Sequence, residues 1–258
     1  MVSSFPPAVT TTTTLSIIIP TYNERTRLGE LVDTISRTFD QHNIAGEIIV
    51  VDDNSPDGTG EFAESLRERY PVRVVHRPGK LGLGSAVIDG FAVASGSVLG
   101  VMDADLSHPP EALPRMLDAL DRFQADLVIG SRYIRGGGTK NWPFVRRAMS
   151  RFACFIARPL TAARDATSGY FLIRRHASEE VTIQARGFKI CLELLVRGRI
   201  RTIVEVPYEF SDRAAGESKM SWREASGYFL QVWDLFQYRR AHPQQQTYHR
   251  DQPKTGSR

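Results

Sequence analysis

Short apolar segments alternate with amphipathic segments along the first half of the chain, and this alternation restricts the fold more than any other feature. Five segments of mostly apolar residues are predicted to be strands: 15–19, 47–51, 72–76, 98–102 and 126–130. The intervening segments carry apolar residues at helical spacing and are predicted to be helices: 24–39, the stretch up to about 69, 83–94 and 113–123. Strands without a polar face belong to a parallel sheet that helices cover on both sides. The sequence therefore predicts an α/β domain with a mostly parallel central sheet and helices on both faces.

The second half of the chain is less regular and sets the predicted domain limits. Helices are expected at 143–160 and 189–196, with strands near 168–174 and 201–206. We predict four regions along the chain: a disordered tail at 1–14, a main domain at 15–220, an amphipathic helix at 221–240 and a disordered polar tail at 241–258.

Composition excludes several classes of protein. With 41% hydrophobic residues among 258, the chain can bury a substantial core. Its two cysteines, Cys154 and Cys191, lie in apolar segments, which favours packed, reduced thiols over a disulfide framework. No segment approaches the roughly 18 to 20 apolar residues of a spanning helix, and the N-terminus lacks the apolar core of a signal peptide. The net charge of +4 suits an anionic ligand or a membrane surface, although a solvated basic face gives the same value.

Polar clusters follow three of the predicted strands. They are Pro20-Thr21-Tyr22-Asn23-Glu24, Asp52-Asp53 and Asp103-Ala104-Asp105. In parallel α/β sheets, ligands bind at the carboxyl ends of the strands, so we expect the three clusters to open onto one crevice. In extended backbone, residues two apart point to the same side, so Asp103 and Asp105 can converge on one hard divalent cation. They could instead be two capping acids before a helix that begins near Pro109.

The order of the motifs carries a family resemblance. The three clusters continue as Ser55-Pro56-Asp57-Gly58-Thr59 and Leu106-Ser107-His108-Pro109-Pro110, and Gly130-Ser131-Arg132-Tyr133 comes after them. Further along the chain come Asn141-Trp142-Pro143, Ser168-Gly169-Tyr170-Phe171, Gly187-Phe188-Lys189, Glu205-Val206-Pro207 and the stretch 212–219. Over residues 15–222 these motifs resemble the ordered signatures of the inverting family 2 glycosyltransferases. Within that family they are similar to those of the dolichol-phosphate mannose synthases.

The resemblance implies a fold and a donor site. The fold would be a GT-A-type, Rossmann-like domain, with residues 15–220 as the catalytic glycosyltransferase domain. The resemblance assigns nucleotide-sugar contacts to Pro20, Tyr22, Glu24, Val51, Asp53 and the Ala104 backbone. Asp103 and Asp105 would bind Mg²⁺ or Mn²⁺ together with the diphosphate. Ser107 occupies the place where some relatives have a Gln that completes the metal shell, and its hydroxyl is a shorter ligand.

The resemblance also implies basic side chains that bind the phosphates of the donor and of the acceptor. Arg132, Arg213 and Lys219 would hold phosphates of the donor and the acceptor, and they join the two aspartates as the residues assigned to catalysis. Arg146, Arg147 and Ser168 would contact the phosphate or lipid of the acceptor. Each of these residues also has a purely structural interpretation. Asp52-Asp53 could form a turn, Tyr22 could be a packed aromatic, and Arg213 and Lys219 could be solvated surface charges.

The implied reaction is mannosyl transfer from GDP-mannose to dolichyl or polyprenyl phosphate, with inversion to a β-linked product. A prenyl phosphate is already ionised near neutral pH, with a second pKa of about 6, so no catalytic base is assigned. Asp165 is the one further carboxylate with an expected functional or loop-capping role. Two other functions remain open: transfer from a UDP-sugar such as UDP-glucose to polyprenyl phosphate, and a non-catalytic nucleotide-binding module.

Two amphipathic segments suit an interfacial location. Segments 146–160 and 221–240 carry apolar faces interleaved with Arg and Trp, which favours contact with a membrane surface, although such helices also pack on their own sheet. We expect a cytoplasmic protein, peripheral on the cytosolic face of the endoplasmic reticulum in a eukaryote or of the plasma membrane in a prokaryote. The resemblance also implies small membrane subunits as partners and no nucleic acid.

Overall fold

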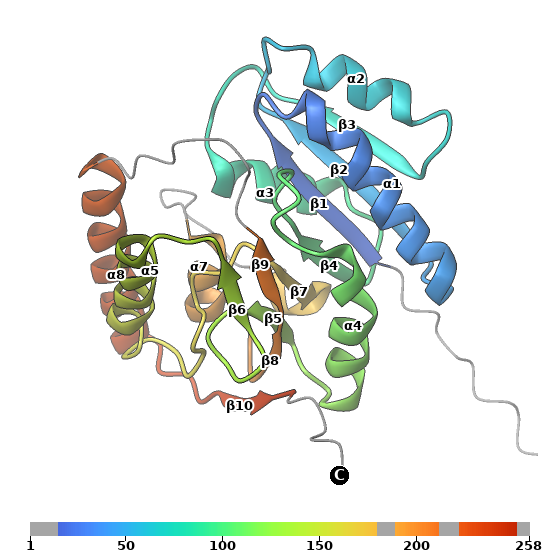
Figure 1. Cartoon of the computed structure of the whole chain (residues 1–258). Helices are drawn as coiled ribbons and strands as arrows, with labels where there is room; N and C mark the ends of the chain where they lie inside the picture. The colour runs from blue at the N-terminus through green and yellow to red at the C-terminus, as the bar shows by residue number, and fades with distance from the viewer. Residues whose placement is uncertain (1–14, 180–188, 212–221, 252–258) are drawn as a thin grey trace, which may run out of the picture.

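A single mixed sheet organises the structure, a computed structural model that describes residues 15–179, 189–211 and 222–251 (Figure 1). The strands of this sheet are β1 (Leu15–Thr21), β2 (Gly46–Asp52), β3 (Val72–His76), β4 (Val98–Val101), β5 (Leu127–Ser131), β7 (Phe171–Arg174), β8 (Thr202–Pro207) and β10 (Thr247–Arg250). Their order is β10-β8-β5-β7-β4-β1-β2-β3. Only β7 runs antiparallel to its neighbours, β4 and β5. The predicted α/β class with a mostly parallel central sheet is confirmed.

Helices cover both faces of the sheet because its central strands are apolar on both sides. In β1, Ile17 and Ile19 belong to one buried cluster, and Ile18 between them belongs to the other. The first cluster includes residues of α1 (Arg25–His42), α2 (Thr59–Leu66) and α4 (Leu113–Arg122). The second includes residues of α3 (Leu83–Val93), α6 (Arg175–Ser178), α7 (Ile190–Arg197) and α8 (Trp222–Ala241).

Short elements complete the described structure. A 3-10 turn at Pro110–Ala112 leads into α4, and α5 (Phe144–Ile156) comes after the small strand β6 (Gly138–Lys140). Strand β6 pairs in parallel with β9 (Glu209–Ser211), outside the main sheet. The sequence prediction lacked both of these strands, since three residues are too few to show a periodic pattern.

The predicted disordered tail at 241–258 is wrong for residues 247–250, which form a strand. Residues 247–250 form β10, which pairs in parallel with β8 at the edge of the sheet. The buried carboxylate of Asp251 binds Arg115 Nε at 2.7 Å and also pairs with Arg122, both on α4. An edge strand needs no apolar face of its own, so its polar sequence gave no strand signal. Residues 252–258 and the tail at 1–14 lie outside the described residues.

Helices α5 and α8 lie side by side and expose apolar side chains. Tyr228 Oη on α8 donates a hydrogen bond of 2.7 Å to the backbone carbonyl of Ala153 on α5, and Figure 1 shows the two helices together. Among the described residues, nine of the eleven exposed large apolar side chains belong to these helices: Phe144, Val145, Met149, Phe152, Phe155, Phe229, Leu230, Trp233 and Phe236. Within the described residues, no helix combines the length and apolarity needed to span a membrane.

Candidate active site

The three polar clusters meet at one edge of the sheet, as predicted. Strand β1 lies between β4 and β2 and is parallel to both, so the three carboxyl ends are adjacent. Each of the loops after these strands contains a non-glycine residue with positive φ: Asn23 at 60°, Asn54 at 58° and Leu106 at 64°. Such backbone is costly for Leu in particular and concentrates at functional sites.

Asp52 joins the first two loops. Its carboxylate accepts hydrogen bonds from Thr21 Oγ1 at 3.2 Å, from the Ser55 backbone N at 3.0 Å and from the Ser55 hydroxyl. Ser55 Oγ in turn accepts the backbone N–H of Asn23 at 3.0 Å, and Thr59 Oγ1 accepts that of Glu24 at 3.0 Å. The turn interpretation of Asp52 is therefore correct, and this turn fixes the loop that carries Tyr22 and Glu24.

Asp53 belongs to a buried ion pair that the sequence reasoning missed. Arg77, directly after β3, pairs with Asp53 Oδ1, while the Gly82 N–H donates to Oδ2 at 3.3 Å. The same guanidinium contacts Asp89 Oδ2 at 2.9 Å. The carboxyl-end rule applied to β3 would have indicated Arg77. The loop held in this way places Lys80 Nζ 4.0 Å from the centre of the partly exposed Tyr22 ring.

The Asp103–Asp105 segment forms a tight turn. Asp105 Oδ1 accepts the backbone N–H of Ser107 at 3.0 Å. The backbone N–H of Asp103 donates to His108 Nδ1 at 3.1 Å, which places the ring proton on Nε2, 3.7 Å from Asp103 Oδ2. Burial lowers the pKa of His108, and the charges of Asp103 and Asp105 only partly oppose that shift. A neutral His108, stacked on Tyr170, therefore holds the backbone of Asp103 and lies beside its carboxylate.

A buried carboxylate fixes Arg132 in the site. Its Nε and Nη2 donate to the two oxygens of Asp165 at 2.8 and 2.7 Å, and its backbone N–H donates to Asp165 Oδ2 at 2.9 Å. Burial acts to lower the pKa of Arg132, and Asp165 outweighs burial, so the pKa is raised overall. Its guanidinium carbon lies 5.4 Å from the ring of Trp142, and Arg146 lies 4.3 Å from the same ring. Lys189, just before α7, lies within electrostatic range of Arg132, and burial lowers its pKa.

Two residues with predicted contacts are buried in the structure. Val51 is fully buried in the core, and its contact with the nucleotide stays a prediction. Ser168 is buried too, and its hydroxyl donates to the Gly130 carbonyl at 2.8 Å and accepts the Tyr170 N–H at 3.2 Å. Both residues support the loops of the site. The predicted phosphate ligands Arg213 and Lys219 lie outside the described residues.

A comparison of the whole sequence with protein families agrees with this geometry. Residues 16–182 match the profile described as "Glycosyl transferase family 2". The chain belongs to glycosyl transferase family 2. The family resemblance drawn from the ordered motifs is confirmed, and the protein is a glycosyltransferase.

Two relatives in this family are named for mannosyl transfer to a lipid phosphate. A "Dolichol-phosphate mannosyltransferase" of Pyrococcus furiosus is 43% identical over 228 residues, covering 87% of this chain and 64% of the relative. A "Polyprenol monophosphomannose synthase" of Mycolicibacterium smegmatis is 42% identical over 228 residues, covering 84% of each chain. The chain thus spans less than two thirds of the archaeal protein and most of the bacterial one.

A solved structure supports the fold assignment. The glucosyl-3-phosphoglycerate synthase of Mycobacterium tuberculosis, in complex with Mn²⁺, UDP and glucosyl-3-phosphoglycerate, superposes with a TM-score of 0.64. The superposition covers 90% of this chain and 81% of that one at 23% identity. The expected GT-A-type fold of this glycosyltransferase is confirmed.

The residues of this family 2 site fit a divalent cation. No group of three or more His, Cys, Asp or Glu side chains within the described residues is arranged to hold a metal. Two carboxylates are nevertheless sufficient for an ion such as Mg²⁺, which keeps several waters and takes substrate phosphates as ligands. A Cβ on Gly169 would lie 3.2 Å from both oxygens of Asp103, so this glycine keeps the space beside the carboxylate open. The buried Ser107 Oγ also has no hydrogen-bond partner within the described residues.

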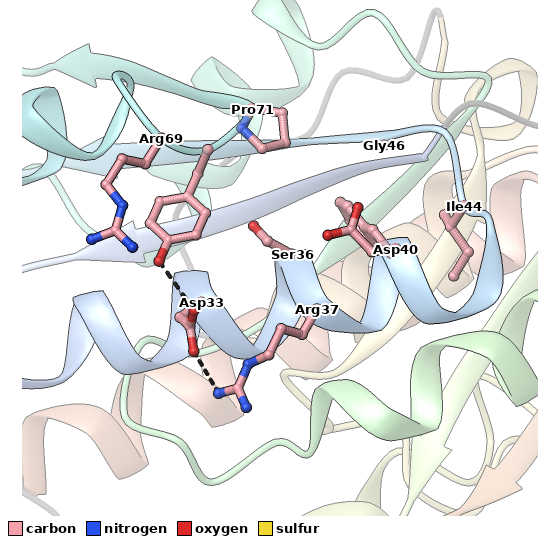
Figure 2. Close-up of a pocket in the computed structure, with 10 residues that line it drawn as sticks. Asp33, Ser36, Arg37, Asp40, Ile44, Gly46, Arg69 and Pro71 are labelled. Atoms are coloured by element: carbon pink, nitrogen blue, oxygen red, sulfur yellow. Dashed lines mark hydrogen bonds and ion pairs between the residues drawn. The ribbon is translucent and has the colours of Figure 1, made fainter.

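A separate pocket of about 350 Å³ lies at the opposite edge of the sheet (Figure 2). It is bordered by α1 and by Gly46 and Pro71, at the starts of β2 and β3. Tyr70 Oη donates to Asp33 Oδ1 at 3.0 Å. Asp33 also pairs with Arg37 at 2.5 Å, as a dashed line in Figure 2 shows. Because the three polar clusters lie at the other edge, this pocket is separate from the active site.

Proposed function

We propose that this chain transfers mannose from GDP-mannose to a dolichyl or polyprenyl phosphate, with inversion to a β-linked lipid-phosphate mannose. The observation that carries the proposal is the identity of 42–43% to proteins named for this activity, over 84–87% of the chain. Two further observations support it: two aspartates, Asp103 and Asp105, come after β4, and Asp165 binds Arg132 after β5.

Asp103 and Asp105 would hold Mg²⁺ or Mn²⁺ with the donor diphosphate, and the Ser107 hydroxyl is close enough in sequence to assist. A cation bound there would neutralise the diphosphate and stabilise it as a leaving group. Tyr22 and Glu24 would border the nucleotide from the β1 loop, next to Pro20. Asp53, held by Arg77, would face the ribose side.

The acceptor phosphate would bind at Arg132 and at Arg146 and Arg147 of α5. Trp142 links these cations, because Arg132 and Arg146 both lie against its ring and Arg147 Nη2 donates to its carbonyl at 3.4 Å. An ionised phosphate oxygen is already a nucleophile, so the site needs positioning and charge stabilisation more than a base.

The lipid tail of such an acceptor lies in a bilayer, and the α5–α8 face is the surface that suits it. Here the α5–α8 face means the nine exposed apolar side chains of these two helices. Arg146 and Arg151 on α5, Arg158 just after α5 and Arg240 on α8 lie close to them in sequence, a pattern typical of peripheral contact with an anionic membrane. We therefore place the enzyme at the cytosolic surface of a membrane; recruitment by a small membrane subunit would use the same face.

The purified chain should transfer mannose from GDP-mannose to a polyprenyl phosphate in the presence of Mg²⁺ or Mn²⁺, and EDTA should abolish transfer. UDP-glucose serves as the competing donor in parallel reactions. Transfer from UDP-glucose alone would refute the mannose assignment, and full transfer in EDTA would refute the role given to the two aspartates.

A further inference from the structure

Arg132 is held so that one nitrogen of its guanidinium remains available. Its Nε and Nη2 are bound by Asp165, and Nη2 also lies 3.4 Å from Thr167 Oγ1. Nη1 makes no hydrogen bond to any residue in the described part of the chain, so it is the nitrogen that we assign to an acceptor phosphate. The orientation of the Arg132 side chain therefore depends on the position of Asp165.

Asp165 is fixed in turn by the carboxylate of Glu205 on β8. Both residues have an exposed fraction of 0%. Glu205 Oε1 accepts the backbone N–H of Asp165 at 2.8 Å, and Oε2 accepts that of Arg164 at 3.1 Å. A buried carboxylate with two backbone donors on one loop holds that loop in a single position, because releasing either donor leaves a buried charge less satisfied.

The C-terminal strand β10 contacts Glu205 through Tyr248. Tyr248 on β10 donates its hydroxyl hydrogen to Glu205 Oε2 and accepts Arg250 Nε at 3.1 Å. Strand β10 is aligned for this contact because it pairs with β8, with Arg250 opposite Glu205. Burial raises the pKa of Glu205, and the bond from Tyr248 is the largest influence that opposes this shift.

We propose that Glu205 and Tyr248 are positioning residues for acceptor binding: through the backbone of Arg164 and Asp165 they hold Arg132 with Nη1 directed at the acceptor phosphate. This inference rests on the proposed function. It makes the C-terminal strand, far from the donor site in sequence, part of the acceptor site. We expect the change in binding to concern the acceptor and not the donor. Arg132 lies against the same Trp142 ring as Arg146 of α5, which is assigned to the acceptor phosphate.

The test compares Tyr248→Phe and Glu205→Gln with Tyr70→Phe. Tyr70 also donates its hydroxyl to a carboxylate, Asp33 at 3.0 Å, but at the opposite edge of the sheet. Loss of one hydrogen bond to a charged group should raise the KM for polyprenyl phosphate roughly tenfold in Tyr248→Phe, and more in Glu205→Gln. The KM for GDP-mannose should change by less than about twofold, since no donor contact is removed.

A measurement that needs no mannosyl transfer tests this inference independently of the proposed function. Cys154 Sγ lies 3.7 Å from Asp165 Oδ1 and 3.2 Å from Thr167 Oγ1, so its rate of alkylation reports whether the loop stays in place. Faster alkylation in Tyr248→Phe and Glu205→Gln, but not in Tyr70→Phe, supports the positioning role even if the wild-type chain transfers no mannose. Wild-type rates of alkylation in both variants, or an acceptor KM equal to that of Tyr70→Phe in an active enzyme, would overturn it.

Discussion

Removing two phenylalanines from the α5–α8 face should release the protein from membranes. Phe152 and Phe155 on α5 have exposed fractions of 57% and 69%. Complete burial of a Phe side chain contributes about 1.5 to 3 kcal/mol, so each exposed portion is worth about 1 to 2 kcal/mol on entering an apolar layer. Replacing both with Ser should therefore cost about 3 kcal/mol of binding free energy, or roughly a 100-fold lower partition coefficient.

Co-sedimentation with phosphatidylglycerol–phosphatidylcholine vesicles measures this partition coefficient. The control is Leu81→Ser, which removes an apolar side chain with an exposed fraction of 57% outside the two helices. Both positions on α5 are exposed, so the substitutions should change the free energy of unfolding by no more than about 0.5 kcal/mol each. Raising the salt concentration should weaken binding of the wild type, because arginines near an anionic surface contribute about 1 kcal/mol each.

Two outcomes would refute the reasoning. If the wild-type chain fails to bind vesicles at low salt, the α5–α8 face does not contact membranes. If the double variant binds as well as Leu81→Ser, these phenylalanines are not the contact. A short-chain, water-soluble polyprenyl phosphate separates docking from chemistry, since the double variant should mannosylate it at the wild-type rate.

Three further outcomes are expected from buried or paired groups. Asp105→Ala should reduce mannosyl transfer at least about 100-fold and abolish the effect of Mg²⁺ on GDP binding by calorimetry; an active variant would contradict the cation site. Arg77→Met leaves the buried Asp53 carboxylate uncompensated and should lower the free energy of unfolding in urea by about 3 to 5 kcal/mol. Burial raises the pKa of Cys154 to about 11, so its alkylation should accelerate about tenfold per pH unit from about pH 8 to about pH 10, and a plateau below about pH 9 would contradict this.

Each of these outcomes has a matched control. Asp118→Ala removes an exposed carboxylate of α4 and should leave transfer unchanged. Arg73→Met removes a half-exposed arginine that lies 3.6 Å from Glu47 and should cost less than about 1 kcal/mol. The denatured chain provides the unperturbed titration of the thiols, and peptide mass spectrometry separates Cys154 from Cys191.

The sequence predicted the main strands because their signal is local. An apolar run between turn residues identifies β1 to β5 within one or two residues, and for β3 the predicted limits, 72–76, are those observed. Strands β6, β9 and β10 were missed for the opposite reason. They have three or four residues with partly exposed side chains, and the partner strand stabilises them more than their own sequence does.

The site was predictable only where a residue comes directly after a parallel strand. That rule led to Asp53, Asp103 and Asp105 and brought their loops together correctly. It could not indicate His108 or Glu205, because their roles depend on which groups the fold packs against them. His108 holds the backbone of Asp103 through a ring buried against Tyr170, and Glu205 acts from inside β8.

The reversed strand β7 explains why the carboxyl-end rule did not place Asp165 and Gly169 in the site. It lies between β4 and β5 and runs antiparallel to both, so Phe171, its first residue, pairs with Val101 near the active-site edge. The segment before β7 therefore reaches the same edge as the segments after β4 and β5. Asp165 meets Arg132 there, and Gly169 lies against Asp103. The carboxyl-end rule cannot indicate residues that precede an antiparallel strand, because the strand order that brings them to the site is set by tertiary packing rather than by any local pattern.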